Sequence, residues 1–369
     1  MARSSDVASR PESVTRFEWL SGSLVAFCLA CLLVTVVAGL VQVRFGSYEM
    51  TRMEVLRAVF DADVLFDPAV WSAFLLGGDL PSLDTRTLVV WTVRMPRVIV
   101  GVVAGAALAI SGAIFQAVTR NELASPFILG VSRGAGFAVL ATLVVFSGLT
   151  PFLPFLAALG GAVAFLITYL IAWKDGTSPV RLVLAGVIVN MVFHSLQRGV
   201  YFLADDIGVV QSAIAWLTGS LTGVGWEQVR IATPAAALAI VLALVGARQL
   251  NVLLLGETTA RSLGMRVERT RLLLSGVGIL AASAAIAVAG IVSFFGLVVP
   301  HIVRNVVGTD YRRLMVGCLF AGPALMVAAD VGARLALRPA QIPVGIVTGL
   351  LGGPYFLYLM RKQQSMGEL

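Results

Sequence analysis

Long uncharged stretches alternate with short charged segments along most of this chain. Residues 20–43, 98–119 and 231–247 each contain no Asp, Glu, Lys or Arg. A helix needs about 20 mostly apolar residues to cross a bilayer. The pattern therefore predicts membrane-spanning helices, the first at residues 20–43. An amphipathic helix has apolar residues on one face only, whereas these runs are apolar continuously over the length of a span.

Two apolar stretches are too long for one span each. Residues 127–173 contain Gly148, Pro151 and Pro154, which predict a break between a third and a fourth helix. Residues 272–303 predict a seventh helix to about residue 289 and a short eighth at 297–303. With further spans at 182–203, 314–334 and 344–360, we expect an all-α integral membrane protein, a compact bundle of about ten transmembrane helices.

Composition supports a lipid environment. Hydrophobic residues make up 58% of the 369 residues and charged residues 13%, whereas a soluble domain carries about a quarter charged residues. The net charge of +7 comes mostly from arginines at the ends of apolar runs. That distribution disfavours a nucleic-acid-binding stripe.

The basic residues also predict the orientation. They are more frequent in the segments that become cytoplasmic when both termini lie inside, and cytoplasmic loops are enriched in Lys and Arg. We therefore expect a multi-pass protein of the cell membrane, N-in and C-in. Cytoplasmic tails at 1–19 and 362–369 flank a single membrane domain at 20–361, with an outer segment at 44–97 and a cytoplasmic loop at 248–271.

No residue pattern indicates catalysis, a metal site or a bound cofactor. Cys28 and Cys31 have CxxC spacing, but they lie in an apolar run and no second pair or His cluster accompanies them. The chain contains no Gly-Lys pair, so it has no Walker-type nucleotide site. If ATP drives this protein, a partner subunit binds it.

Four polar residues share one face of the predicted fifth span: Asn190, His194, Gln197 and Tyr201, at i, i+4, i+7 and i+11. Polar groups at membrane depth usually face the bundle interior or an aqueous cavity. The face could therefore line a translocation pathway. It could equally supply hydrogen bonds between packed helices.

The loop at 251–270 reads NVLLLGETTARSLGMRVERT and concentrates charge between two apolar segments. Glu257 follows Gly256 and would lie in the first turn of a short helix, where an acid complements the helix dipole. Gly264 would end that helix. A small apolar contact face is predicted on this helix, formed by Ala260 and Leu263 and flanked by Arg261 and Arg266.

Several motifs resemble the iron-siderophore, haem and cobalamin permease family of ABC importers, the ten-helix type II importers. The resemblance covers the chain from about residue 90 to the C-terminus. It is carried by VRMPRVIVGVVAGAALAISGAIFQAVTRNELASPFILGVSRGAG at 93–136, LLGETTARSLGM at 254–265, GIVSFFGLVVPHIVRNVVGTDYRRL at 290–314 and IPVGIVTGLLGGPYFLYLM at 342–360. Arg133 departs from the family pattern, where a small or polar residue is more usual.

The resemblance implies three sites. The cytoplasmic loop would fold into two short helices and dock on a separate ABC ATPase subunit through Gly256, Glu257, Ala260, Arg261, Leu263 and Gly264. Arg94, Arg97 and Arg334 at the outer mouth would pair with acidic residues of an extracytoplasmic substrate-binding protein, although snorkelling to the interface also explains arginines there. The fifth-span face would line a pathway at the interface with a second copy of the chain.

We therefore expect the permease subunit of an ATP-driven importer of a bulky metal chelate, with a ferric siderophore favoured over cobalamin or haem. The subunit itself is not an enzyme. Two other classes remain open. A secondary transporter would work without ATP and would show coupling-ion residues in unwound midplane segments. A structural or receptor membrane protein would need neither the polar face nor the charged loop.

Overall fold

The computed structural model describes residues 21–367 apart from 47, 49, 175, 205, 338 and 339, and describes side chains as far as Tyr358. The predicted tail at 1–19 lies outside these residues, as do the last two residues of the tail at 362–369. Within the described part the regular structure is helical, apart from one isolated β-bridge between Trp173 and Thr177. The all-α class is confirmed.

Seven helical runs are long and apolar enough to cross a membrane. They are α1 (Gly22–Arg44), the run Thr85–Thr119 formed by α5 (Thr85–Val89), η2 (Val90–Arg94) and α6 (Met95–Thr119), the run of η3 (Ser147–Phe152) and α8 (Leu153–Ala172), α9 (Pro179–Tyr201), α11 (Trp226–Val245), α14 (Val267–Ala289) and α16 (Tyr311–Leu335). Shorter apolar helical stretches are Pro68–Gly77, α7 (Val131–Val144), α10 (Ile207–Thr218), α15 (Phe295–Val307) and the part of α17 (Val344–Gly367) as far as Tyr358.

The predicted break between the third and fourth spans is confirmed, because η3 separates α7 from α8. The helix that contains the predicted second span begins earlier than residue 98. Helix α6 continues outward through η2 and α5 as one run of 35 residues. At 1.5 Å per residue such a run is about 52 Å long, well beyond a hydrocarbon core of about 30 Å. About 20 residues suffice to cross that core, so residues 85–97 lengthen the helix outward, and their assignment to the outer segment stays a prediction.

Helix α10 departs from the sequence prediction. The pattern predicts a loop between the fifth span and the sixth, because residues 204–230 contain polar and charged residues and no apolar run long enough to span. The structure nevertheless forms a 12-residue helix there. Asp206 caps it by accepting a hydrogen bond from the Gly208 N–H at 2.7 Å. A helix this short is stabilised by its neighbours, which a sequence pattern does not record.

Helix α6 lies at the centre of the bundle and packs against α11, α14, α15 and α16. The small residues in its sequence allow the close approaches. A Cβ atom at Gly105 would lie 2.6 Å from the Gly322 carbonyl oxygen of α16, and one at Gly112 would lie 1.8 Å from that of Gly296 in α15. Without a hydrophobic driving force between helices in lipid, such backbone contacts provide the packing energy.

Gly219, Gly290 and Gly345 lie where the ends of α10 and α14 meet the start of α17 inside the bundle. Ser220 N–H donates to the Ala289 carbonyl at 2.8 Å, and Gly345 N–H donates to the Gly219 carbonyl at 3.1 Å. A Cβ at Gly345 would lie 1.9 Å from the Thr218 carbonyl oxygen, and one at Gly290 would lie 2.3 Å from that of Trp216. The ends of α10 and α14 and the start of α17 therefore satisfy one another's backbone groups, which membrane burial requires.

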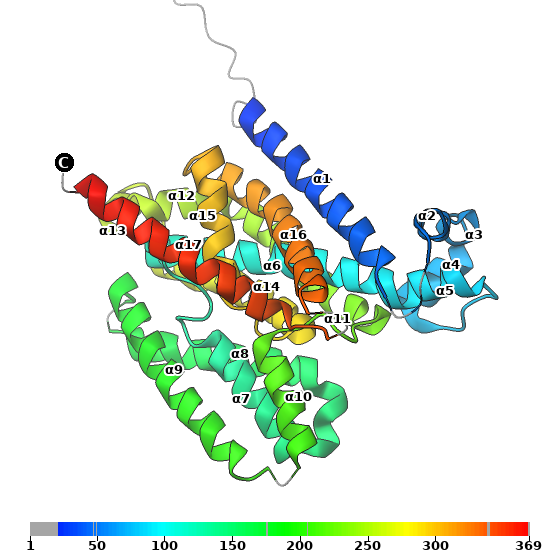
Figure 1. The fold of residues 1–369 in the computed structure, drawn as a ribbon. Coiled ribbons are helices and arrows are strands. Elements are labelled where there is room, and N and C mark those ends of the chain that lie inside the picture. The colour runs from blue at the N-terminus through cyan, green and yellow to red at the C-terminus, as the bar shows by residue number, and fades with distance from the viewer. Residues whose placement is uncertain are drawn as a thin grey trace, which may run out of the picture.

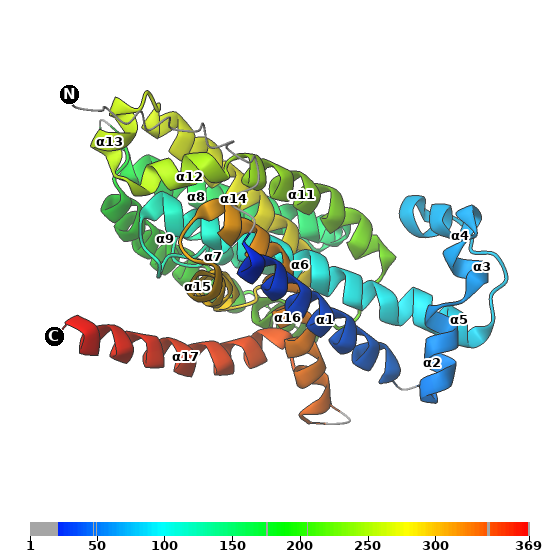
Figure 2. The same ribbon diagram turned by 90° about the horizontal axis from the view of Figure 1, so that it is seen from above.

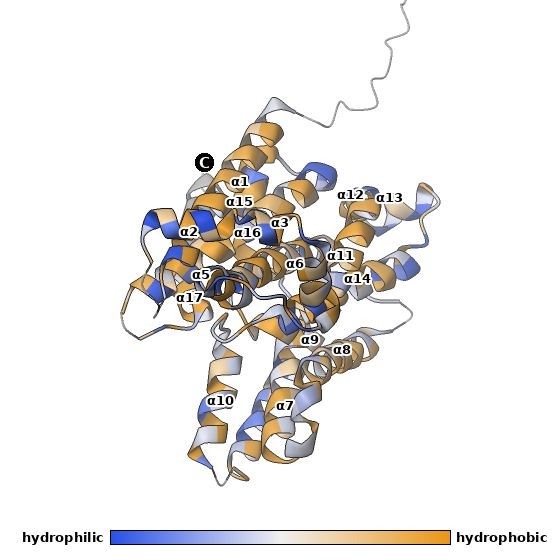
Figure 3. Ribbon diagram, turned by 90° about the vertical axis from the view of Figure 1, so that its right-hand side faces the viewer, coloured by the Kyte–Doolittle hydropathy of each residue, from blue (hydrophilic) through white to orange (hydrophobic). Residues whose placement is uncertain are grey.

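The short helices gather at opposite ends of the molecule. The outer segment folds as α2 (Arg52–Val59), α3 (Ala62–Leu65), α4 (Pro68–Ser72) and η1 (Ala73–Gly77), beside α5. It lies at the right in Figures 1 and 2, whereas the cytoplasmic loop helix α13 (Glu257–Ser262) and the far end of α17 lie at the left. Figure 3 shows the most hydrophilic patches on α2 and other short segments, with apolar colour along most of the long helices.

Candidate functional site

The cytoplasmic loop contains two short helices, α12 (Ala247–Leu254) and α13 (Glu257–Ser262). Gly256 precedes α13 with φ of +97°, and Gly264 follows the capping residue Leu263 with φ of +81°. Both values lie in the left-handed region that favours glycine. Glu257 begins the helix, so the local structure of this loop follows the sequence prediction.

The two sides of α13 differ in exposure. Leu263 is 62% exposed, and the Arg261 side chain is exposed to the same extent. Ala260, predicted to be part of the contact face, is instead fully buried against the chain's own core. The prediction for Ala260 is wrong because Ala260 occupies the side of the helix that packs onto the bundle. An exposed leucine beside an exposed arginine remains as the outward surface.

Arg271 connects α13 to the membrane helices. This residue lies in the second turn of α14, and its side chain is only 2% exposed. Its guanidinium donates to Glu257 Oε1 at 2.7 Å, to Glu268 Oε1 at 3.2 Å and to Thr177 Oγ1 at 2.9 Å. Thr177 Oγ1 in turn donates to Glu268 Oε2 at 2.7 Å. Glu257 therefore points into the protein, toward the turn that precedes α9.

Arg97 forms a buried ion pair at the outer mouth. Its guanidinium binds both carboxylate oxygens of Asp330 at 2.8 Å, a bidentate geometry. Asp330 is fully buried and also accepts a hydrogen bond from Gln42 Nε2 of α1. Arg97 Nη1 donates to Gln341 Oε1 at 2.8 Å. This network ties α1, α6 and α16 together.

Arg94 is also buried and donates to the carbonyl oxygens of Val43 at 2.6 Å, Arg44 and Tyr48. Arg334 is partly buried and donates to the Gln42 carbonyl at 3.1 Å. The expectation that Arg94 and Arg97 present free guanidinium groups to a partner is therefore corrected. Both hold their own chain together, because burying an arginine requires that its donors be satisfied.

The predicted polar face of α9 divides into two parts. Asn190 Nδ2 donates to the Phe127 and Ile128 carbonyls at 2.8 and 2.9 Å, and the buried Gln197 donates to the Arg133 carbonyl at 3.0 Å. Asn190 thus fastens α9 to the segment that leads into α7, and Gln197 fastens it to α7 itself, as hydrogen bonds between packed helices would. His194 and Tyr201 are partly exposed, and for them a place on the pathway stays a prediction.

Two grooves lie along α9. An inner groove of about 660 Å³ is lined by Thr119, Arg120, Asn121, Pro179, Val180, Val183, Leu184 and Leu254. A second groove of about 380 Å³ is lined by Phe127, Ile128, Arg133, Val187, Asn190, Met191 and His194. Arg133, the residue that departs from the family pattern, is exposed and is the one arginine among the lining residues of the second groove. A face of α9 thus borders open space over much of its length.

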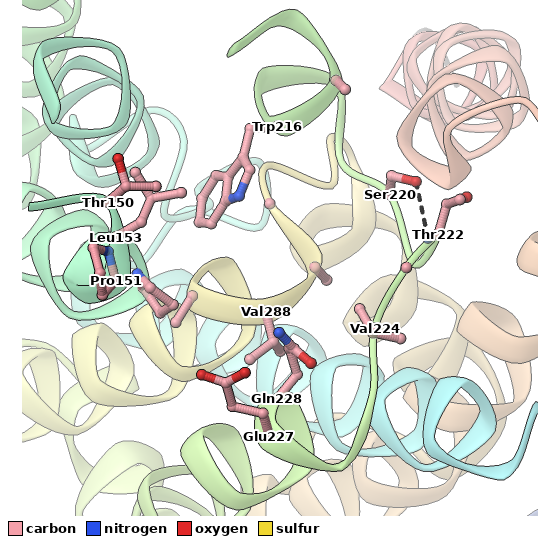
Figure 4. A pocket seen from close by; sticks show the side chains of 16 residues that line it. Thr150, Pro151, Leu153, Trp216, Ser220, Thr222, Val224, Glu227, Gln228 and Val288 are labelled. Atoms are coloured by element: carbon pink, nitrogen blue, oxygen red, sulfur yellow. Dashed lines mark hydrogen bonds between the residues drawn. The ribbon is translucent and has the colours of Figure 1, made fainter. Parts of the chain in front are cut away.

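A third cavity, of about 480 Å³, lies at the junction of the interrupted helices (Figure 4). Trp216 of α10, Pro151 of η3 and Val288 of α14 line it, and Glu227 supplies the single acid among its lining residues. Ser220 Oγ accepts a hydrogen bond from the Thr222 N–H at 3.1 Å on its rim. The cavity shares no lining residue with either groove along α9.

The expectation that the sequence contains no pattern typical of catalysis is wrong in one place, because residues 130–134 read GVSRG and match the GxSxG pattern of serine hydrolases. Ser132 is 2% exposed, and its hydroxyl has no hydrogen-bond partner among the described residues. A nucleophilic serine needs a base within hydrogen-bond reach. The pattern therefore reflects the small residues with which α7 packs. In the described part of the chain no three His, Cys, Asp or Glu residues are grouped as metal ligands.

The sequence prediction misses Arg271 and Thr177 as parts of the site. In the sequence, Arg271 is one of several basic residues of the predicted cytoplasmic loop, and no motif distinguishes Thr177 from other threonines. The available signal is an arginine one turn into an apolar helix, which must find acidic or carbonyl partners once it is buried.

A model of the FecCD transport family matches residues 19–362 of this chain. A ferric enterobactin permease of Escherichia coli, FepG, is 34% identical over 345 residues, covering 94% of this chain and 98% of that protein. The ferric citrate permease YfmD of Bacillus subtilis is 40% identical over 280 residues, covering 76% of this chain and 83% of that protein.

The cobalamin permease BtuC of Halobacterium salinarum is 41% identical over 288 residues, covering 76% of this chain and 75% of that protein. Among solved structures, a metal-chelate type ABC transporter in an inward-facing conformation aligns with a TM-score of 0.75 and 26% identity. That alignment covers 91% of this chain and 99% of the other.

Proposed function

The chain belongs to the FecCD transport family, and we propose that it moves a ferric siderophore along the α9 face, paired with a second copy of itself. It is the permease subunit of an ABC importer and a multi-pass protein of the cell membrane. Importers of this family carry ferric siderophores, haem or cobalamin. Because the α9 face borders both grooves, it is the face to which we assign the pathway.

The observation that carries the proposal is the connection of α13 to α9 through Arg271. An ABC ATPase subunit would contact the exposed side of α13, at Leu263 and Arg261. Its closure on ATP would displace α13, and the Glu257–Arg271–Thr177 contacts would transmit that displacement to the turn before α9. A ligand shifts a conformational equilibrium only by binding one state better than the other, and here the ATPase dimer is that ligand.

The substrate proposal rests on the relatives. YfmD and FepG are named for ferric citrate and ferric enterobactin. Cobalamin is the alternative substrate, because the cobalamin permease BtuC is 41% identical to this chain. An extracytoplasmic binding protein would deliver the chelate to the outer mouth. Arg334 also binds its own chain, at the Gln42 carbonyl, but it is the most exposed of the three predicted docking arginines, since Arg94 and Arg97 are buried.

The test is reconstitution of this chain in liposomes with its ATPase and its binding protein. ATP-dependent uptake of ⁵⁵Fe bound to a siderophore, absent with a hydrolysis-deficient ATPase, is the expected result. Uptake of cobalamin or haem alone would reassign the substrate and keep the importer. Uptake driven by an ion gradient without the ATPase would reject the importer mechanism in favour of a secondary transporter.

A further inference from the structure

The segments that border the α9 grooves carry arginines and almost no acids. Between residues 123 and 204 the sequence contains Arg133, Lys174, Arg181 and Arg198, and its single acid is Asp175, which precedes α9. Glu122, Asp205 and Asp206 flank this stretch; Glu122 pairs with Arg304, and Asp206 caps α10. Helices α7 and α9 themselves contain no Asp or Glu. Lys174 lies just before the start of α9 and Arg181 just after it, where cytoplasmic loops are enriched in basic residues. Arg133 and Arg198 lie farther along the membrane helices, where charged residues are rare and mark functional sites.

Arg133 lies near the middle of the membrane-spanning region. Asn190, the twelfth of the 23 residues of α9, binds the carbonyls of Phe127 and Ile128 just before α7. Arg133 is in the first turn of α7, and its guanidinium reaches Gln197 Oε1 at 3.4 Å, two turns farther along α9. The side chain therefore lies between the levels of Asn190 and Gln197.

Within the described part of the chain, no carboxylate lies within ion-pair distance of Arg133, Arg120 or Arg198. The ion pairs among the described residues are Glu54–Arg86, Asp330–Arg97, Glu257–Arg261, Glu257–Arg271, Glu268–Arg271, Glu122–His301 and Glu122–Arg304. Arg133 is nevertheless exposed. An arginine at this depth is costly against lipid, and arginines inside membrane proteins usually face the bundle interior or a water-filled cavity. The second groove along α9 gives Arg133 such a surface.

Helix α10, which packs against α7, offers no carboxylate to this face, and neither does α17, which packs against α10. Residues 207–226, which include α10, contain no acid, and neither does α17 at 344–367. Homodimerisation would place two copies of Arg133 on the pathway. The inner groove adds Arg120, and Arg198 lies one turn outward of His194 on α9. Charge of one sign in a low-dielectric channel focuses the potential and raises the local concentration of counter-ions.

We propose that Arg133 makes the translocation pathway selective for anionic chelates, those whose metal is held by carboxylate or catecholate oxygens and whose complex carries net negative charge. Arg133 does not speed the passage of neutral hydroxamate complexes or of cobalamin, because these carry no net negative charge for it to attract. The inference rests on the proposed function, because it takes the α9 face to be the pathway. Arg133 acts on passage through the membrane, and its role is independent of recognition by the binding protein.

The experiment uses the complete reconstituted importer, with ferric citrate as the anionic probe, a neutral ferric trihydroxamate and cobalamin. Initial rates are measured at saturating chelate for the wild type, Arg133→Lys, Arg133→Ser and Arg133→Glu. We expect ferric citrate turnover to fall about fivefold in Arg133→Ser and more than tenfold in Arg133→Glu, with Arg133→Lys near the wild type. The chelate concentration for half-maximal uptake should not move, because the binding protein sets it.

Arg57→Ser, an exposed arginine of the outer segment, is the matched control and should leave all rates unchanged. ATPase stimulation by the binding protein checks that each variant is folded. A ferric citrate turnover that is equal in the wild type, Arg133→Ser and Arg133→Glu overturns the inference, as does wild-type uptake restricted to a neutral chelate. Neither outcome contradicts the assignment of this chain as the permease of an ABC importer. Absence of ATP-dependent uptake of every probe by the wild type rejects the proposed function itself.

Discussion

The cytoplasmic loop and the outer mouth look alike in the sequence, yet the structure treats them differently. Both contain arginines beside the end of an apolar run, and the sequence predicts partner docking at both. In the loop, α13 presents Leu263 and Arg261 to solvent. At the outer mouth, Arg94 and Arg97 are buried and bind groups of their own chain. The position of a charge near a membrane boundary therefore does not reveal whether its partner belongs to the same chain.

The cost of burial explains the difference. A guanidinium in the interior must bind carboxylates or carbonyls, and removing one partner leaves an uncompensated charge. A guanidinium on a solvated helix is free to pair weakly and to exchange partners. Arg97 belongs to the first kind and Arg261 to the second. Substitutions at these and neighbouring positions test this division, in decreasing order of their expected effect on uptake.

Substitution of Arg97 should abolish uptake by destabilising the protein. Arg97→Ala would leave the fully buried Asp330 without its bidentate partner, at a cost of about 3–5 kcal/mol. Thermal unfolding in detergent should show a large loss of stability. The double variant Arg97→Met with Asp330→Leu should recover much of it, because no unpaired charge remains. Normal stability of Arg97→Ala with failed binding-protein docking would instead restore Arg97 as a docking residue.

Leu263→Arg should leave stability unchanged and reduce ATP-driven uptake more than tenfold. Leu263 is exposed, so the fold does not depend on it, whereas an apolar contact with the ATPase would be lost. Leu263→Met is the control that keeps the apolar surface and should transport normally. Charge reversal at Glu257 is a poorer test, since it would place an arginine against Arg271. Uptake by Leu263→Arg at the wild-type rate would disprove the contact.

Thr177→Val should have an intermediate effect, because it removes a hydroxyl that accepts from Arg271 and donates to Glu268. Losing hydrogen bonds to charged groups costs about 1.5–3 kcal/mol. We expect a moderate loss of stability and about a threefold fall in uptake per ATP hydrolysed. Thr177→Ser keeps both bonds and serves as the control. An unchanged ratio of uptake to hydrolysis in Thr177→Val would show that this turn does not transmit the motion.

Arg261→Ala should have the smallest effect. Its contact with Glu257 is long, at 4.0 Å, and its side chain is exposed. Such i,i+4 pairs contribute about 0.3–0.5 kcal/mol, so the unfolding temperature should scarcely move and uptake should change less than twofold. Ionic strength should modulate the residual effect, since exposed charges are screened. A loss of uptake as large as that of Leu263→Arg would make Arg261 a principal ATPase contact.

Much of the fold is predictable because membrane spans depend on local composition. The apolar runs, the break near Pro151 and the short helix after Gly256 are all visible in the sequence. Helix α10 is not, because a 12-residue helix without a spanning run resembles a loop. The extension of the second-span helix outward through residues 85–97 is also missed. Charged residues there suggest that the helix begins near residue 98, whereas in the structure it begins at Thr85.

The candidate site is predicted unevenly. Leu263 and Arg261 lie on the exposed side of α13, but Ala260 is buried. Asn190 and Gln197 belong to the predicted polar face, although Asn190 fastens α9 to the segment leading into α7 and Gln197 fastens it to α7 itself. In the sequence Arg133 stands out only as a departure from the family pattern. Its significance requires knowing that it is exposed in a groove whose lining residues include no carboxylate.

The sequence by itself determined that this chain is a helical membrane protein with a charged cytoplasmic loop, because a bilayer accepts only long apolar helices and loop charges correlate with orientation. Its motifs also determined the family. The tertiary structure decided which charge meets which partner. Arg97 binds Asp330, which is 233 residues away, and Arg271 binds Thr177, which is 94 residues away. Such pairings depend on how helices pack, and packing brings together residues that no local pattern connects.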